Sequence, residues 1–443
     1  MKKNFVFMLM CVVCASVEAQ YAHYSEWMTY SEMKRVEHPY YLDFSSSPKW
    51  SYVMGIEMES MLDTYLMYGG DEIISYLKEY PEKMISSTGS ITGYKYSDFN
   101  LDNVRTGRFI LRMYNMFRES KDSVAIETLL KQLENQPRTE AGPWYHKAIY
   151  ANQVWLDGIY MGLPFYTMVA PQLRGGSEDK YYADAVMQMK ATDERTYDAE
   201  TNLWKHAWDE THSIFWADAT TGQSQHTWGR ALGWFAMAFV EVLDVMPETY
   251  EGREELVGIF RDIMSSVVDY QDAESGVWYD VMDVVDSRNY LEATCSAMFT
   301  YCLLKGARLG YLDETYREAG VKAYRGMIDE FVVENHDGTI SLQKCVSVSG
   351  LGPESNPKRD GSFEYYMSES VRDNDAKGVG PFVWASLEME RLGYTVDNLD
   401  DDMTAVTVLK VEGEEGTSYD LQGRVVGENG RGMVLSRGRK VVR

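Results

Sequence analysis

GWFAMAFVEVL, at residues 233–243, has apolar side chains at the i, i+3 and i+4 spacing of a helix and is rich in aromatic and small residues. A similar run, ATCSAMFTYCLLKGARLG, occupies residues 293–310. By contrast, SVAIETLLKQLE at 123–134 carries more charge and suits a half-solvated position. These two kinds of helix predict an inner and an outer layer.

Helical periodicity of these two kinds recurs along the chain in about twelve segments, with inner and outer types in alternation. Six inner and six outer helices in alternation describe a double ring, so the predicted fold class is all-α, an (α/α)6 toroid. The catalytic mouth would then be built by the loops and first turns that lead into the inner helices. The expected helices are 24–38, 55–69, 71–84, 102–118, 122–136, 147–162, 180–193, 229–246, 252–270, 292–310, 314–333 and 376–392, and the even-numbered ones are inner.

The two ends of the chain differ from this helical middle. Residues 1–20, MKKNFVFMLMCVVCASVEAQ, combine two lysines, an apolar run and small residues near Ala19, which predicts a secretory signal peptide and export, with the periplasm as the leading destination. From about residue 405, short β-branched runs separated by Gly-rich turns predict a few strands. We therefore expect a signal peptide (1–19), a toroidal catalytic domain (20–400) and a small β-like tail (405–443), which is either a sorting module or a tail packed on the toroid's edge.

Charge and composition exclude several classes of partner. The net charge of −25 makes nucleic acid and anionic membrane surfaces poor partners. Beyond the N-terminal segment, no apolar run is long enough to cross a membrane. An acidic substrate would therefore need a local basic cluster. For the chain itself we expect a monomer or a weak oligomer.

Motifs of metal, nucleotide and serine-nucleophile chemistry are missing from the sequence, which lacks HExxH, a P-loop, GxSxG and, after the signal peptide, CxxC. We therefore expect no metal and no cofactor. Cys295 and Cys302 stand seven residues apart on a predicted helix, about 10 Å along its axis, which is too far for a disulfide. They are interpreted as small core residues.

The sequence does contain carboxylates beside aromatic side chains, which are typical of the active sites of carbohydrate enzymes. Asp102, in NLDNVRTGRFILRMY, precedes a helical run, so it is either a helix cap or first-turn charge or a functional acid. Asp157 is the one acid in PWYHKAIYANQVWLDGI, residues 143–159. A buried Asp can simply bond a neighbouring helix, but such apolar surroundings would also raise its pKa, as a general acid at neutral pH requires.

Two further motifs place possible ligand-binding groups nearby in the sequence. LWKHAWDETHSIFWAD, residues 203–218, sets His206 among aromatic residues, where the alternative is a core or surface histidine. TWGRALGW, residues 227–234, sets Trp228 and Trp234 beside glycines, which would leave a flat ring open to a sugar face. Its Arg230 can hold a carboxylate with its fork of donors. Close helix packing would explain the glycines but not the arginine.

Six motifs occur in this order along residues 24–394: LDNVRTG, WYHKAIYANQVWLDGIYMGLPFY, KHAWDE, FWADATTGQSQHTWGRALGW, NYLEATCSAM and GVGPF. Together they resemble the unsaturated glycuronyl hydrolases of glycoside hydrolase family 105, best known for unsaturated rhamnogalacturonyl hydrolases. The resemblance implies removal of a 4,5-unsaturated uronic acid from the non-reducing end of lyase-generated oligosaccharides, by protonation at C4 and addition of water at C5. By motif position it implies that Asp157 is the proton donor and then the base for water, and that Asp102 is the second aspartate. It implies that the substrate-binding residues are His206, Arg230, Trp228, Trp234 and Lys147.

Lys147 fits this assignment poorly on helix geometry. On one unbroken helix it would lie about 15 Å from Asp157 and some 80° out of phase. Either the helix begins after Lys147, or Lys147 contacts a distal part of the substrate. Two other functions stay open: a conventional inverting glycosidase that uses Asp102 and Asp157 as base and acid, and a non-catalytic glycan-binding protein.

Overall fold

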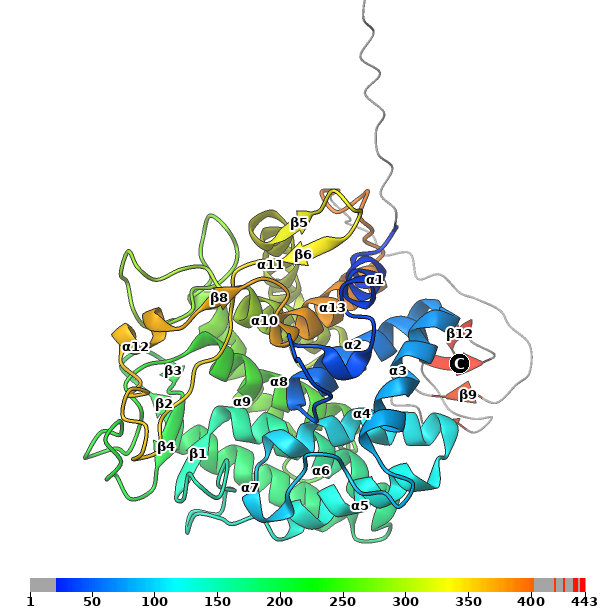
Figure 1. Ribbon diagram of the computed structural model, residues 1–443. Coiled ribbons are helices and arrows are strands. Elements are labelled where there is room, and N and C mark those ends of the chain that lie inside the picture. Colours follow the sequence, from blue (N-terminus) through cyan, green and yellow to red (C-terminus); the bar gives the residue numbers. More distant parts are fainter. Residues whose placement is uncertain (1–20, 402–417, 420–424, 427–432, 437–438, 443) are drawn as a thin grey trace, which may run out of the picture.

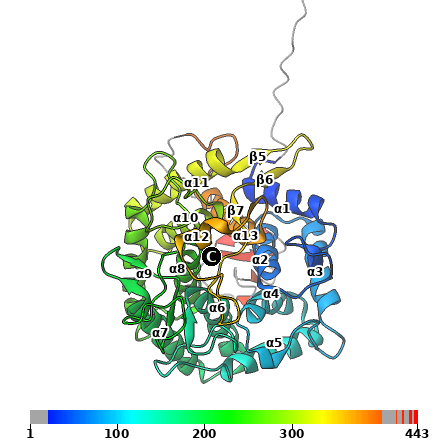
Figure 2. The same ribbon diagram turned by 60° about the vertical axis from the view of Figure 1, so that its left-hand side comes forward.

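The computed structural model describes residues 21–401 and four short strands at 418–419, 425–426, 433–436 and 439–442 (Figure 1). The signal peptide expected at 1–19 lies outside the described residues. In the described part, helices form two concentric rings, which Figure 2 shows nearly end-on.

Within residues 21–401, six helices make the inner ring. Each packs against the next along the chain, and the last packs against the first, so the ring is closed. Most residues of these helices are buried, and nearly all of those in α8 and α10 are, in agreement with their apolar and small side chains. The inner helices are α2 (Tyr52–Tyr68), α4 (Asp102–Phe117), α6 (Leu156–Leu173), α8 (Gly229–Val245), α10 (Ala293–Arg308) and α13 (Ala376–Arg391).

The outer ring lies against the inner one and exposes its charged faces. α5, for example, packs between α4 and α6, and α9 packs between α8 and α10. The (α/α)6 toroid predicted from the alternation of inner and outer patterns is thus confirmed. The outer helices are α1 (Tyr24–Arg35), α3 (Asp71–Met84), α5 (Ser120–Glu134), α7 (Glu178–Thr196), α9 (Arg253–Asp269) and α11 (Glu314–Phe331).

Close packing explains two glycines and the cysteines. A Cβ at Gly233 would lie 2.7 Å from the sulfur of Met298, and one at Gly229 would lie 3.0 Å from the sulfur of Cys295, so both glycines let α8 approach α10. Cys295, Cys302 and the other cysteine of the described chain, Cys345, are buried and form no disulfide.

Short pairs of strands lie at the end of the ring where the inner helices begin. β1 (Gln153–Trp155) pairs antiparallel with β4 (Ala207–Asp209). The helix expected at 147–162 therefore starts only at Leu156, because the preceding residues pair with a distant strand. The remaining elements are η1 (Pro39–Tyr41), η2 (Tyr96–Asp98), β2 (Tyr197–Asp198), β3 (Leu203–Trp204), β5 (Val332–Glu334), β6 (Ile340–Leu342), β7 (Cys345–Val346), α12 (Phe363–Ser368) and β8 (Val371–Arg372).

The C-terminal strands form an antiparallel sheet in the order β10-β9-β11-β12, as the expectation of a β-like tail required. A sorting role for this tail stays a prediction. Among the helices of the described residues, none has the length and apolar character to span a membrane. The four strands are β9 (Ser418–Tyr419), β10 (Val425–Val426), β11 (Met433–Ser436) and β12 (Arg439–Val442).

Candidate active site

The first turns of the inner helices bring the candidate side chains together. Asp102 is the first residue of α4, and Asp157 is the second residue of α6. Both carboxylates act electrostatically on Tyr52, the half-buried first residue of α2. Burial first, and then Asp102, raise the pKa of the Tyr52 phenol; Asp375 and Asp157 add to this, while Arg230 opposes them. The site therefore lies in the first turns, where a toroid was expected to carry it.

Asp102 is held by two basic side chains from the loop before α6. The Lys147 ammonium lies 2.6 Å from its Oδ2, and Nε2 of His146 lies 3.3 Å from its Oδ1. Burial alone would raise the pKa of Asp102, but Lys147 and His146 outweigh it and hold the pKa well below its ordinary value. Asp102 is therefore a carboxylate at neutral pH. Its ion pairs with Lys147 and His146 are not explained by helix capping.

The path of the chain explains how Lys147 reaches Asp102. The backbone N–H of Leu101 donates to the carbonyl of His146 at 3.1 Å, which ties this loop to the start of α4. The His146 ring stacks on Trp155 with 4.9 Å between centroids. A Cβ at Gly158 would lie only 2.9 Å from Nδ1 of His146, so glycine makes room for the ring. The first alternative for Lys147, a helix that begins after it, is the one found.

Asp157 lies beside His206. The Oδ2 atom of Asp157 is 3.2 Å from Nε2 of His206, and the Asp157 side chain is 15% exposed. The β1–β4 pair sets this contact, because the Leu156 N–H donates to the His206 carbonyl at 3.1 Å. Within the described residues, neither of the two facing atoms has a partner with hydrogen-bond geometry. Nδ1 of His206 is 2.9 Å from the Tyr366 hydroxyl.

The two tryptophans of TWGRALGW do not lie open as expected. Trp228 and Trp234 are each 1% exposed. Trp228 packs between His206 and Arg230, while Trp234 stacks on Tyr160 with 4.8 Å between centroids. The glycines beside these tryptophans admit a neighbouring helix instead of a sugar ring. Direct stacking on the substrate by either ring stays a prediction.

Arg230 is nearly fully buried, at 1% exposure, and its Nη1 donates to the Val346 carbonyl at 2.6 Å. The structure thus groups Arg230 with Trp228 and His206 behind Asp157, and it places Lys147 beside Asp102. Trp234 lies one turn deeper in α8, next to Tyr52. Every residue predicted for the site therefore lies at or just beneath the same end of the ring.

Comparison with known proteins identifies the family of this chain. Residues 24–393 match the sequence model of Glycosyl Hydrolase Family 88. A family 105 glycoside hydrolase of C. acetobutylicum is 36% identical, with a TM-score of 0.79 over 83% of this chain and 99% of its own. A protein of Agrobacterium fabrum is 36% identical over 52% of this chain and 97% of its own length. The unsaturated rhamnogalacturonyl hydrolase YesR of Bacillus subtilis is 25% identical over 62% of this chain and 74% of its own length.

The chain belongs to the glycoside hydrolases of families 88 and 105. It is a glycosidase of the unsaturated glycuronyl and rhamnogalacturonyl hydrolase class. The resemblance drawn from the motifs is confirmed at this level.

Sequence reasoning missed several residues of this glycosidase's site. His146 stands next to Lys147 in WYHKAIY, and that adjacency was the available signal. The Nε1–H of Trp228 donates to Asp280 at 2.9 Å. Glu292 caps α10 by accepting from the Cys295 N–H at 2.7 Å and also accepts from the Val346 N–H at 2.9 Å. Glu292 thereby holds Val346, the β7 residue whose carbonyl accepts from Arg230, while Asp280 holds the Trp228 ring.

Asp280→Asn is expected to change how the stability of the glycosidase depends on pH. Burial first, and then the charge of Glu292, raise the pKa of Asp280 from 3.8 to about 7. The folded protein therefore binds this proton more tightly than the unfolded chain. The stabilisation is complete below the unfolded pKa and is lost as the pH rises through about 7. The amide of the variant is uncharged, like the protonated acid, and its oxygen can still accept from the Nε1–H of Trp228.

In urea unfolding, this variant should thus match the wild type in acid and become the more stable of the two above neutral pH. A constant difference in the free energy of unfolding at all pH values would contradict the assignment.

Lys147→Met is expected to lower kcat/KM about 10- to 100-fold at neutral pH, because a charge-assisted hydrogen bond to Asp102 is lost. The pKa of Asp102 should rise, since burial remains while its strongest opposing charge is gone. The acid limb of the pH–rate profile should then move to higher pH. Lys131→Met, at a side chain 60% exposed, is the matched control. An unshifted acid limb would argue against this role of Lys147.

Proposed function

We propose that this glycosidase removes a 4,5-unsaturated uronic acid from the non-reducing end of lyase-generated oligosaccharides, foremost those derived from rhamnogalacturonan. One observation carries the proposal. The two carboxyl groups at the mouth stand in different electrostatic settings, because Asp102 forms close ion pairs with Lys147 and His146, whereas the close ionisable partner of Asp157 among the described residues is His206. Asp102 is thereby fixed as an anion, and Asp157 is the acid that we assign to proton transfer.

In the proposed reaction, Asp157 gives its proton to C4 of the enol ether. The resulting Asp157 carboxylate then takes a proton from the water that adds to C5. The C5 hemiketal opens by breaking its bond to the ring oxygen, and the remaining sugar leaves from C1. Asp102, held as an anion, orients the ring hydroxyls and the water without being consumed.

The charge distribution supports an anionic substrate. A chain of net charge −25 repels a uronate in general, so the mouth must supply positive charge locally. The Lys147 side chain is 23% exposed there, and Arg230 and His206 lie behind it in the same site. Lys147 is therefore the basic side chain that we assign to the substrate carboxylate at the mouth.

The test is hydrolysis of a lyase-generated unsaturated disaccharide in oxygen-18 water, with immediate borohydride reduction to stop exchange of the ketone oxygen. Label at C5, together with loss of the alkene's ultraviolet absorbance, is expected. Label at C1 would instead indicate a conventional inverting glycosidase, and binding without turnover would overturn the proposal. Parallel assays with unsaturated galacturonyl-rhamnose and with unsaturated glucuronyl disaccharides decide the substrate class.

We also propose that the protein is exported. The support is the signal-peptide pattern of residues 1–19. Mass spectrometry of the N-terminus of the protein recovered from the producing cell should find cleavage near Ala19. An intact N-terminus in the cytoplasmic fraction would contradict export.

A further inference from the structure

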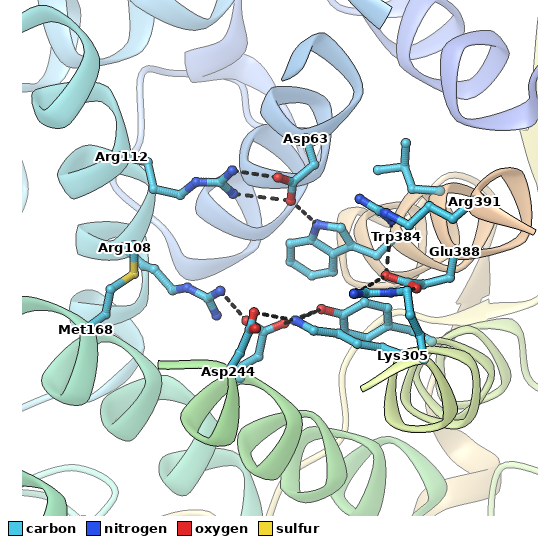
Figure 3. Close-up of a pocket in the computed structure, with 13 residues that line it drawn as sticks. Asp63, Arg108, Arg112, Met168, Asp244, Lys305, Trp384, Glu388 and Arg391 are labelled. Atoms are coloured by element: carbon cyan, nitrogen blue, oxygen red, sulfur yellow. Dashed lines mark hydrogen bonds and ion pairs between the residues drawn. The ribbon is translucent and has the colours of Figure 1, made fainter. Parts of the chain in front are cut away.

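Acids at the two ends of the ring have different kinds of partner. At the end away from the mouth, Glu388 pairs with Arg391 and Arg308 (Figure 3). Burial alone would raise the pKa of Glu388, but the two guanidinium groups outweigh it and lower the pKa to about 2. An acid held in this way has no proton to give at neutral pH. Asp157 instead lies 3.2 Å from a histidine, His206, and an imidazole, unlike a guanidinium, can be neutral.

The His206 ring is held by two aromatic neighbours and by one hydroxyl group. Its centroid lies 5.4 Å from that of Trp155 and 5.0 Å from that of Trp228. These contacts fix the plane of the ring, but a ring turned by 180° about its Cβ–Cγ bond would fill nearly the same space. The Tyr366 hydroxyl, 2.9 Å from Nδ1, distinguishes the two orientations, because the turned ring would present a carbon atom to it.

Tyr366 is itself fixed in its place. The residue is fully buried, and its ring stacks on Trp228 with 6.1 Å between centroids. It lies in α12, whose N-cap residue, Ser362, accepts from the Tyr365 N–H at 3.1 Å. The Tyr365 hydroxyl accepts from the Gly350 N–H at 2.9 Å, which ties α12 to the loop before it. The hydroxyl of Tyr366 is therefore a fixed point against which the imidazole can be oriented.

The direction of this hydrogen bond follows from the atoms that face each other. Burial first, and then neighbouring acidic groups, raise the pKa of the Tyr366 phenol well above its ordinary value, so the phenol keeps its proton. If Nδ1 of a neutral His206 carried the ring proton, the Nε2 lone pair would face Oδ2 of Asp157 at 3.2 Å. Two such acceptors repel each other unless the proton of the acid lies on Oδ2, which is buried. Donation from the phenol to Nδ1 avoids this, because it leaves the ring proton on Nε2.

We propose that Tyr366 is a positioning residue of this glycosidase. Through Nδ1 it holds the Nε2–H of His206 toward Oδ2 of Asp157, so that the proton for C4 is carried by Oδ1. The Nε2–H then stabilises the carboxylate that remains after proton transfer, and neither Tyr366 nor His206 gains or loses a proton. Catalytic hydrogen bonds often become aligned only when the substrate is bound, which accounts for a close contact without hydrogen-bond alignment. The inference rests on the proposed function, since it assigns a role in that reaction.

The tautomer of His206 tests the proposal without any substrate. The chain has 7 histidines, so histidine-selective nitrogen-15 labelling gives few imidazole signals in a nuclear magnetic resonance spectrum. The signal that disappears in His206→Gln identifies the residue. In the wild-type enzyme at neutral pH, Nε2 should be protonated and Nδ1 should be a hydrogen-bonded acceptor. A proton on Nδ1, alone or together with one on Nε2, would overturn the proposal.

Kinetics test whether Tyr366 acts through His206. Tyr366→Phe should lower kcat about 10-fold and leave KM within about twofold, as expected for the loss of one hydrogen bond that matters in the transition state. In a His206→Gln background, the same change should lower kcat no further, whereas a merely structural effect would persist. The proposal fails if the loss persists in that background, or if Tyr366→Phe alone keeps wild-type kcat.

Tyr324→Phe is the matched control. Tyr324 is 1% exposed, and its hydroxyl donates to Ser386 at 2.8 Å between α11 and α13. This variant should keep wild-type kcat. If Tyr366→Phe does not fold, as judged by circular dichroism, the wild-type tautomer still decides. A wild-type enzyme that does not turn over the unsaturated disaccharide would refute the proposed function, while the tautomer would still test the placement of His206.

Discussion

Asp157→Asn is expected to lower kcat about 10³-fold, because the amide has the shape of the acid but no proton to deliver. The contact with His206 and the β1–β4 pair depend on backbone position and shape, so KM should change little. The measurement is the rate of loss of alkene absorbance from an unsaturated disaccharide, with circular dichroism as a check on folding.

Asp286→Asn is the matched control for this prediction. Asp286 pairs with the exposed Arg288 and lies outside the candidate site. The control should keep wild-type kcat. An Asp157→Asn enzyme with activity within tenfold of the wild type would show that another group donates the proton.

Glu59→Gln is expected to destabilise the fold by about 3–5 kcal/mol, because it leaves buried guanidinium groups without their counter-charge. Glu59 is fully buried in α2, and Arg105, Arg108 and Arg112 of α4 approach it at 2.8, 3.1 and 3.3 Å. Burial alone would raise the pKa of Glu59, but the three arginines outweigh it and lower the pKa. The midpoint and free energy of urea unfolding measure the loss.

Glu318→Gln, at an exposed position of α11, is the control and should change stability by no more than about 0.5 kcal/mol. A similarly small effect of Glu59→Gln would mean that water enters between residue 59 and the three arginines and compensates for the lost charge.

The candidate site was only partly readable from the sequence. Asp102 was found because it is an acid at the start of an inner helical pattern, and Asp157 because it is the one acid in an apolar and aromatic stretch. The Asp102 contact with Lys147 was not predicted, because it depends on the backbone bond from Leu101 to His146. The expected open ring of Trp228 was wrong, because Asp280 and His206 cover it from segments far along the chain.

The alternation of two helix types along the chain was enough to predict the toroid. Apolar periodicity is a local property, and alternation between buried and half-solvated helices leaves few ways to cover every apolar face. Tertiary structure alone decided where α6 begins, since β1 exists only through pairing with β4. It also decided that acids and bases scattered along the chain meet as ion pairs at both ends of the ring. Charge pairing across a ring depends on distances of a few ångströms between elements far apart in the chain, and no local pattern encodes those distances.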